Sequence, residues 1–147
     1  MSAEPRPARS PGQQRSTRQA AAVDAALDAA DRFLTARQLY DELRNRGQDV
    51  GLTTVYRHVK RLADAGSLDV VIRPDGEASY RLCGPGRPGD DPAGHHHHLV
   101  CRVCGRSVEV EGPEVEAWAE RVAAAAAFSD IEHTVEIFGT CDRHQSS

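Results

Sequence analysis

The stretch His95-His-His-His-Leu-Val-Cys-Arg-Val-Cys-Gly105 runs four imidazoles directly into a Cys-x-x-Cys pair. Nitrogen and thiolate donors at this density are those that zinc, a borderline-soft and tetrahedral cation, selects. The run is internal and leads into an apolar pair, which favours a strand over a solvated His-rich loop. In a strand, His95 and His97 would point to one face. His96 and His98 would point to the other, so one strand could serve two metal sites.

A second pair of donors, Cys141 and His144, stands near the end of the sequence. With Cys101 and Cys104 it would supply three thiolates and one imidazole, a closed tetrahedral set of the structural zinc type. Such a site would pin the last strand to the first hairpin of this half. The alternative is a redox dithiol, but a thioredoxin-like Cys-x-x-Cys opens a helix, whereas Gly105 and a strand follow here.

Composition and charge narrow the class of protein. The 147 residues suffice for one ordinary domain or two small ones. Residues 1–82 carry 13 Lys and Arg against 11 Asp and Glu, and residues 83–147 carry 5 against 11, so the halves have charges of +2 and −6. Mild basicity in the first half permits a nucleic-acid partner. Because no apolar leader or membrane-length run occurs, we expect a cytoplasmic protein with no membrane partner, where spaced cysteines bind metal.

The first half has the pattern of a small helical domain with a hairpin. Residues 1–14 offer nothing to bury and are expected to form a disordered arm. Three amphipathic helices should follow. Two begin with capping-box spacing at Ser16 and Thr35, and the third runs from Leu52 to just before Gly66.

Two predicted strands, 68–72 and 78–82, flank the turn Arg73-Pro-Asp-Gly76 and complete a winged helix-turn-helix domain over residues 15–83. In this architecture the third helix enters the major groove of double-stranded DNA. The exposed face of that helix is expected to carry Thr54, Arg57, His58 and Arg61. Arg57 and Arg61 lie four residues apart on one side, where they could reach the duplex. The alternative is a merely solvated basic face, but the hairpin behind the helix favours DNA.

The second half is predicted to be a separate, smaller domain. Residues 84–94 have the composition of a linker or hinge. Residues 95–147 should form two strands, a helix that starts at Pro113 and a last strand over 131–138. The helix is expected to turn Val115, Trp118, Ala119 and Val122 inward. A domain this small is expected to complete its sheet in a homodimer. The predicted fold class is therefore α+β, with an N-terminal winged helix-turn-helix followed by a small α/β dimerisation domain.

Two isolated donors allow more than one interpretation. Cys83 ends the second wing strand, where a lone cysteine is usually a small buried apolar residue. A metal that joined it to His96 and His98 across the linker would instead fix the two domains relative to each other. His133 lies in the last predicted strand and is either a core histidine or a ligand.

The segments Gly51-Leu-Thr-Thr-Val-Tyr-Arg57, His95–Gly105 and His133-Thr-Val-Glu-Ile-Phe-Gly-Thr-Cys141 together resemble the ferric uptake regulator family, most closely its zinc-sensing branch in actinobacteria. The resemblance covers about residues 15–144. It implies three zinc sites: a structural site of Cys101, Cys104, Cys141 and His144, a regulatory hinge site of Asp69, Cys83, His96 and His98, and a further site of His95, His97, Glu116 and His133. It also implies DNA contacts from Thr54, Tyr56 and Arg57, and Arg18 matches a basic position at the start of the first helix.

The chain departs from the pattern of this branch in two places. The structural site of the branch usually closes with a fourth cysteine where this chain has His144, and the linker before His95 is longer than expected. A longer tether lowers the effective concentration of one half-site for the other, which would weaken coupling between the domains.

The resemblance implies a homodimeric, zinc-responsive transcriptional repressor of zinc-uptake genes, with two to three zinc ions per chain and a double-stranded DNA operator as partner. The nearest alternative is an iron- or peroxide-sensing regulator of the same family, which the Cys83 thiolate disfavours. A zinc hydrolase would need a His-x-Glu or His-Glu-x-x-His pattern, and neither occurs. A metallochaperone would not need a winged helix. We therefore expect neither an enzyme nor a small organic substrate.

Overall fold

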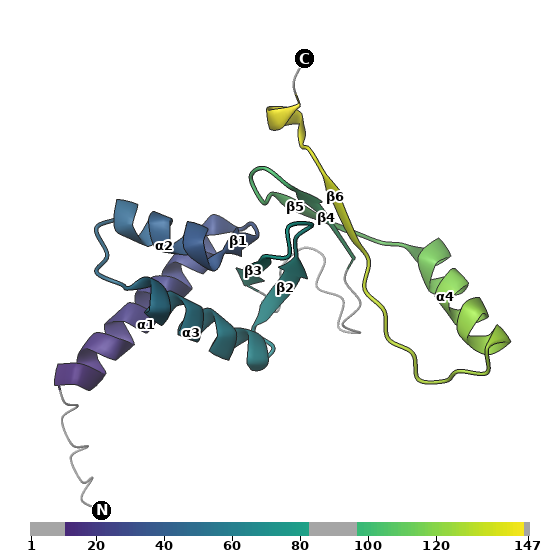
Figure 1. The fold of residues 1–147 in the computed structure, drawn as a ribbon, viewed down its shortest axis with the longest axis horizontal. Helices are drawn as coiled ribbons and strands as arrows, with labels where there is room; N and C mark the ends of the chain where they lie inside the picture. Colours follow the sequence, from purple (N-terminus) through teal and green to yellow (C-terminus); the bar gives the residue numbers. More distant parts are fainter. Residues whose placement is uncertain (1–10, 83–96, 146–147) are drawn as a thin grey trace, which may run out of the picture.

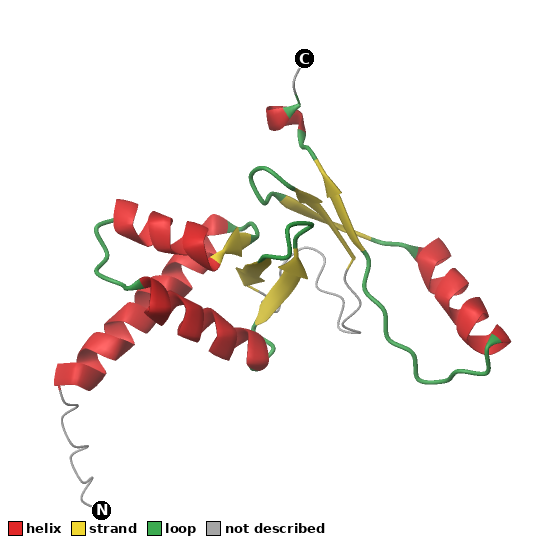
Figure 2. Ribbon diagram, viewed as in Figure 1, coloured by secondary structure: helices red, strands yellow, loops and turns green. Residues whose placement is uncertain are grey.

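The computed structural model describes residues 11–82 and 97–145, which form two lobes (Figure 1). The first lobe holds three α-helices and a small sheet, and the second holds a separate sheet, one α-helix and a 3-10 turn (Figure 2). This architecture confirms the predicted α+β class. In chain order the elements are α1 (Pro11–Ala30), β1 (Leu34–Thr35), α2 (Ala36–Asn45), α3 (Leu52–Asp64), β2 (Leu68–Ile72), β3 (Ala78–Leu82), β4 (His97–Cys101), β5 (Ser107–Val110), α4 (Pro113–Ala125), β6 (Glu136–Gly139) and the 3-10 turn η1 (Asp142–His144).

Local signals in the first lobe are confirmed at α2, α3 and the β2–β3 hairpin. The Thr35 hydroxyl accepts a hydrogen bond from the Gln38 backbone N–H at 3.1 Å, and the Gln38 side chain accepts one from the Thr35 N–H at 3.0 Å. This is the predicted capping box. Gly47 follows the end of α2 with a φ of +71°, a value that glycine adopts without strain. Since these signals are local, the sequence alone could locate the elements.

Helix α1 begins earlier than predicted. It starts at Pro11 rather than at Ser16, so residues 11–14 of the expected disordered arm are helical. Proline is favourable at a first helical position, and a distant loop holds the first turns. Arg15 Nη2 lies 2.9 Å from the Asp49 carboxylate, and Gln19 donates to the Asp49 carbonyl at 2.9 Å. These partners are more than two dozen positions away along the chain, where no capping pattern can find them. Residues 1–10 lie outside the described part.

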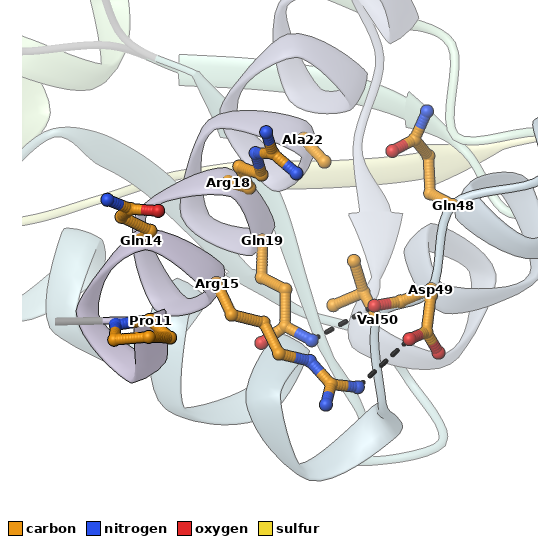
Figure 3. Close-up of a pocket in the computed structure, with 9 residues that line it drawn as sticks. All are labelled: Pro11, Gln14, Arg15, Arg18, Gln19, Ala22, Gln48, Asp49 and Val50. Carbon is orange, nitrogen blue, oxygen red and sulfur yellow. Dashed lines mark hydrogen bonds and ion pairs between the residues drawn. The ribbon is translucent and has the colours of Figure 1, made fainter.

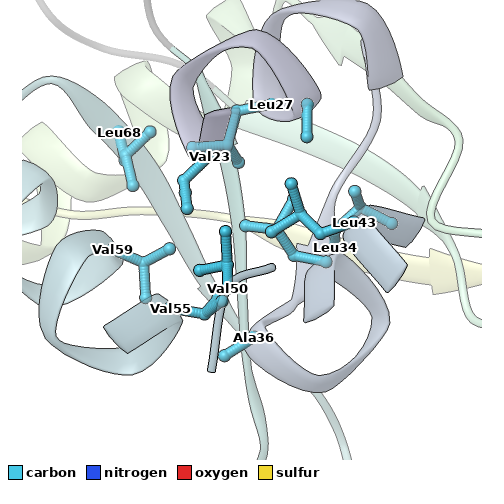
Figure 4. Close-up of a cluster of buried hydrophobic side chains, with 11 residues drawn as sticks. Val23, Leu27, Leu34, Ala36, Leu43, Val50, Val55, Val59 and Leu68 are labelled. Carbon is cyan, nitrogen blue, oxygen red and sulfur yellow. The ribbon is translucent and has the colours of Figure 1, made fainter. Parts of the chain in front are cut away.

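The core of the first lobe lies where the three helices meet the sheet of order β1-β3-β2 (Figure 4). Burying each large apolar side chain there stabilises the lobe by about 1.5–3 kcal/mol. The stripe that α3 contributes, Val55 and Val59, is fully buried. Burial of this stripe fixes the opposite side of α3 at the surface. The other buried members of the cluster are Val23, Ala26, Leu27, Leu34, Ala36, Leu39, Leu43, Val50 and Leu68.

The sheet of the second lobe has the order β5-β4-β6, with β4 antiparallel to β5 and parallel to β6. The prediction of a strand over 131–138 is wrong in its extent, because β6 spans only Glu136–Gly139. Its first partner on β4 is His98, and the described part of β4 begins one residue earlier. The His98 N–H still donates to the Val135 carbonyl at 3.1 Å, but the Val135 N–H donates to the His97 ring rather than to a strand, so the described pairing of β6 begins at Glu136.

Helix α4 begins at Pro113 as predicted, but its apolar residues do not point inward. It stands off the sheet (Figure 1), and none of its residues is buried. Trp118 is 59% exposed and Val122 is 49% exposed. The stripe was expected to pack on its own domain. A three-stranded sheet whose neighbouring helix projects away from it provides no such surface within one chain.

The two lobes meet at the turn between β4 and β5. The Phe33 N–H donates to the Gly105 carbonyl at 3.0 Å, and the Arg32 guanidinium donates to the Cys104 carbonyl at 2.9 Å. Phe33, Val71 and Val100 form a small buried cluster across the junction, with Phe138 packed against it. The Cys-x-x-Cys turn therefore rests directly on the first lobe.

Gly105→Ala should loosen this junction. Gly105 has a φ of +75°, and a Cβ there would collide with the carbonyl oxygen of Phe33. The matched control is Gly76→Ala, since Gly76 has a φ of +86° and open space around it, so this variant has only the backbone cost of about 1–2 kcal/mol. We expect Gly105→Ala to lower the free energy of unfolding by at least about 1 kcal/mol more than the control in a denaturant titration. Equal losses in the two variants would contradict the close approach.

None of the helices in residues 11–82 and 97–145 has the length and apolar character needed to span a bilayer.

Candidate metal centres and nucleic-acid interface

Four donors gather beside the β4–β5 turn. Cys101 ends β4, Cys104 lies in the turn, and Cys141 and His144 follow β6, which pairs with β4 in parallel. Their ligand atoms all lie within 4.8 Å of one another. The Cys104 and Cys141 sulfurs are 3.8 Å apart, and Cys141 Sγ lies 3.2 Å from His144 Nδ1. Two thiolates at about 2.3 Å from a tetrahedral zinc would be about 3.8 Å apart, so the set fits zinc.

The electrostatics of this cluster favour a thiolate at Cys101. Burial disfavours the charged form, but hydrogen bonds from the backbone N–H groups of Cys104, Cys141 and Val103 outweigh it and lower the pKa of Cys101 to about 6. At Cys141 the effect is the reverse, because burial and the neighbouring sulfurs raise the pKa of that thiol. Zinc ligands must be deprotonated. The Cys101 thiol is thus mostly in its metal-binding thiolate form before a metal binds.

Zinc uptake by the four-donor site should release fewer protons than three ordinary thiols would. At about pH 7.5 the Cys101 thiol is already ionised, because its pKa is lowered from 9.0 to about 6. The lowered pKa also means that its contribution to stability is present above pH 9 and is lost as the pH falls toward 6. Calorimetry in buffers of different ionisation enthalpy counts the protons. We expect the wild type to release about one proton fewer per zinc ion than three ordinary thiols would, and the release of three would contradict this assignment.

A second cluster forms where β4 faces α4 and the segment before β6. His97 Nε2 lies 2.8 Å and His133 Nε2 lies 3.1 Å from the same Glu116 carboxylate oxygen. The hydrogen bond from His97, aided by the charge of His133, lowers the pKa of Glu116. Two imidazoles and a carboxylate within 4.8 Å can ligate zinc. His97 Nδ1 accepts a hydrogen bond from the Val135 N–H at 3.3 Å. A metal bound at Nε2 would leave the ring proton on Nδ1, which could then no longer accept from Val135. His95, the fourth predicted ligand, lies outside the described residues.

The third predicted site is described in part. His98 is buried and points to the opposite side from His97, with Nε2 3.8 Å from Asp69 Oδ2. Asp69 belongs to β2 of the first lobe, so this pair spans the junction between the lobes. The other two predicted donors, Cys83 and His96, lie outside the described residues. The structure therefore brings together one donor from each lobe at the junction.

An ion pair that the sequence analysis missed lies beside this junction. Arg81 pairs with Asp69 across β2 and β3, and Glu109 pairs with His98 across β4 and β5. Arg81 Nη1 lies 3.6 Å from Glu109 Oε1, and both side chains are largely buried. No local pattern in the sequence indicates this ion pair, because its partners belong to different lobes.

The exposed side of α3 carries the residues predicted to bind DNA. Arg57 and Arg61 are exposed, Tyr56 is 47% exposed and Thr54 is half-buried. An open groove of about 620 Å³ runs between α3 and the β2–β3 wing. It is lined by Tyr56, Arg57, Lys60, Ala63, Asp64, Val70 and Tyr80. Burial and the nearby Tyr56 raise the pKa of Tyr80, so its hydroxyl stays a hydrogen-bond donor. One expectation is wrong: His58, grouped with this exposed side, is buried.

Arg18 lies on α1, beside a pocket of about 440 Å³ between that helix and the loop that leads into α3 (Figure 3). Arg15 points toward the loop and is paired with Asp49, as the dashed line in Figure 3 marks. Arg18 is exposed on the same helix. Arg18 is therefore a basic side chain near the loop that leads into α3.

The chain matches the sequence profile of the ferric uptake regulator family over residues 12–138. It is 50% identical over 127 residues to the zinc uptake regulation protein of Mycobacterium tuberculosis, covering 86% of this chain and 92% of that protein. It is 30% identical over 117 residues to the ferric uptake regulation protein of Neisseria meningitidis, covering 80% of this chain and 76% of that protein.

A solved structure gives the same result. The crystal structure of FurB from Mycobacterium tuberculosis, described as a zinc uptake regulator, matches with a TM-score of 0.51 and 48% identity. The match covers 90% of this chain and 96% of that one.

Proposed function

Because the chain belongs to the ferric uptake regulator family, whose members are transcription regulators rather than enzymes, we propose that it is a zinc-responsive repressor of zinc-uptake genes. The observation that carries the proposal is the opposite orientation of two neighbouring histidines on β4. His97 faces the cluster with Glu116, whereas His98 faces Asp69 of the first lobe. One strand thus connects a donor cluster of the second lobe to the lobe that would bind DNA.

Zinc bound at the junction would hold the lobes together. We assign Asp69, Cys83, His96 and His98 to this site, and residues 15–83 and 95–147 to the two domains that it would join through the 84–94 linker. Asp69 and His98 supply an anionic and a neutral donor from different lobes. Shifting a two-state equilibrium from 1:99 to 99:1 needs about 5.5 kcal/mol of differential binding, which one well-ligated zinc can provide.

The donor sets favour zinc over iron as the signal. We assign Cys101, Cys104, Cys141 and His144 to a structural zinc and His95, His97, Glu116 and His133 to a further one, which gives two to three ions per chain. The Cys83 thiolate assigned to the junction site suits zinc as the signal, while ferrous iron prefers nitrogen and oxygen donors. The greater identity to a zinc regulator than to a ferric one agrees with this choice.

Operator binding is assigned to α3 and to the start of α1. Tyr56 and Arg57 on the N-terminal half of α3 would meet base edges in the major groove, as a recognition helix does. Thr54, Arg61 and Arg18 would contact the duplex beside them. A regulator of this kind would act in the cytoplasm, where its DNA is.

Zinc dependence of DNA binding tests the proposal. Chelator-treated protein is titrated with zinc, and its binding to a library of random duplexes is followed by enrichment at each zinc level. We expect one ion that resists the chelator, at least one that exchanges, and an enriched duplex only when the exchangeable ion is bound. If the enrichment of a duplex does not depend on zinc, or if it requires ferrous iron instead, the zinc assignment is wrong.

Regulators of this family act as dimers, and the sheet of the second lobe offers a surface for one. Val108, Leu99 and Ile137 are register partners across β5, β4 and β6, and all three are exposed. They form an apolar face, and we propose that a second copy covers it together with the exposed stripe of α4. Pairing through this face would place two recognition helices on one duplex.

Ile137→Glu should turn the dimer into a monomer. Ile137 is 49% exposed, and a carboxylate there would be buried at the proposed interface at a cost on the order of 2 kcal/mol per copy. The matched control is Ile72→Glu, because Ile72 is 55% exposed but lies in the first lobe. Sedimentation velocity measures the dissociation constant. Comparable weakening in both variants would place the interface elsewhere.

A further inference from the structure

One buried polar residue of α3 takes no part in the proposed metal sites or in direct DNA contact. The His58 side chain is only 6% exposed and lies between α1 and α3. Its Nε2 is 2.7 Å from an Asp24 carboxylate oxygen on α1. Its Nδ1 is 2.8 Å from Arg61 Nη2, one turn further along α3. Both ring nitrogens therefore have a partner, one from each helix.

The chemistry of the two partners determines which nitrogen of this ring carries the proton. A guanidinium can only donate hydrogen bonds, so Nδ1 must accept from Arg61. The proton of the neutral imidazole then lies on Nε2, which donates to the Asp24 carboxylate. Asp24 thus fixes the tautomer that accepts from Arg61, as an outer carboxylate fixes a metal-bound histidine.

Arg61 lies in the last turn of α3 and is exposed. The first residues of a recognition helix meet base edges, so its last turn comes to the phosphate backbone at the edge of the groove. One guanidinium N–H is used by His58, which leaves four for a phosphate. A long side chain held by a buried ring loses less rotamer freedom on binding than a free one.

We propose that His58 is a positioning residue that holds Arg61 ready to bind a DNA phosphate, in the tautomer that Asp24 imposes. This inference rests on the proposed DNA-binding function. A core with only a structural role would have an apolar side chain at this position. The proposal explains why a polar residue connects α1 and α3 here instead.

Two substitutions of His58 separate the roles of its nitrogens. His58→Asn places an amide oxygen where Nδ1 was, so it keeps the acceptor for Arg61 and loses Asp24. His58→Gln reaches the position of Nε2, so it keeps the donor to Asp24 and loses the acceptor for Arg61. Thermal unfolding of both variants, and of Asp24→Ala at an exposed position, checks that each one folds.

The probes are one duplex enriched by the zinc-loaded wild type and one unrelated duplex of equal length. We expect His58→Gln to bind both about tenfold more weakly and His58→Asn to stay within about twofold of the wild type. Asp24→Ala should bind about two- to threefold more weakly, because the tautomer is no longer fixed.

In an Arg61→Ala background, His58→Gln should have no further effect. Loss of Arg61 should reduce the slope of log affinity against log salt by about 0.9 for each phosphate contact.

The outcomes separate this inference from the proposed function. If the wild type enriches a duplex but the Asn and Gln variants bind it equally, or if the Gln effect persists without Arg61, the positioning role is wrong and the repressor stands. If zinc-loaded wild type enriches no duplex, the proposed function fails and this inference fails with it.

Discussion

Cys101→Ser should cost the protein its tightest zinc ion and the order of the second lobe. Cys101 is the most buried of the four clustered donors and is 6% exposed, with backbone N–H groups around its sulfur. A serine hydroxyl cannot supply a thiolate at neutral pH. Zinc binding at structural sites contributes on the order of 10 kcal/mol, which is comparable to the whole stability of a small domain.

The reason for so large an effect is the small size of this lobe. Among the described residues 97–145, only His97, His98, Val100, Cys101 and Gly105 are buried. A zinc ion at the four-donor cluster would tie the end of β4 to the segment after β6. Strands β4 and β6 are adjacent in space but are joined by a long crossover. Without the metal, the parallel pair would keep its backbone hydrogen bonds but would have few buried side chains to support it.

Zinc content by atomic absorption and thermal unfolding by circular dichroism measure the loss. We expect Cys101→Ser to retain one zinc fewer per chain and to lose the cooperative transition of the second lobe. The control is His144→Cys, which keeps four donors in the same positions and should keep the ion. A Cys101→Ser protein that holds as much chelator-resistant zinc as the wild type would show that the structural site lies elsewhere.

The parts of the fold that the sequence predicted correctly are those with local causes. The capping box of Thr35 and Gln38 defines the start of α2, and the Pro-Asp-Gly turn fixes the β2–β3 hairpin. The alternation of side chains along β4 separated His97 from His98 before any geometry was known. The Cys-x-x-Cys spacing and the distant Cys141 were recognisable because thiolates have few other uses in such a pattern.

The parts that the sequence could not supply depend on partners far along the chain. The parallel pairing of β6 with β4 shortens the last strand, and no periodicity shows which residues will find a partner. The stripe of α4 has a pattern typical of a core helix, yet Trp118 is exposed, because the pattern does not say whether the covering surface belongs to the same chain. His58 fitted the exposed side of α3 by spacing, but Asp24 of α1 draws it into the interior.

Arg57→Ala should abolish specific DNA binding while the fold and the zinc content stay unchanged. Arg57 is exposed on the N-terminal half of α3 and lines the groove between that helix and the wing. A bidentate arginine contact with guanine is worth about 1–3 kcal/mol, and a dimer presents two copies, so the loss is about 2–6 kcal/mol. Fluorescence anisotropy with a duplex enriched by the wild type measures the affinity.

The matched control is Arg121→Ala, which removes the same charge from an exposed position on α4, away from the groove. If Arg57 reads bases, its loss should weaken the enriched duplex far more than an unrelated one, whereas a phosphate contact would weaken both equally. Arg121→Ala should leave the preference between the two duplexes unchanged. If Arg57→Ala still binds the enriched duplex as tightly as the wild type does, α3 is not the reading element. The repressor mechanism proposed for this chain would then be wrong, even with all three zinc sites intact.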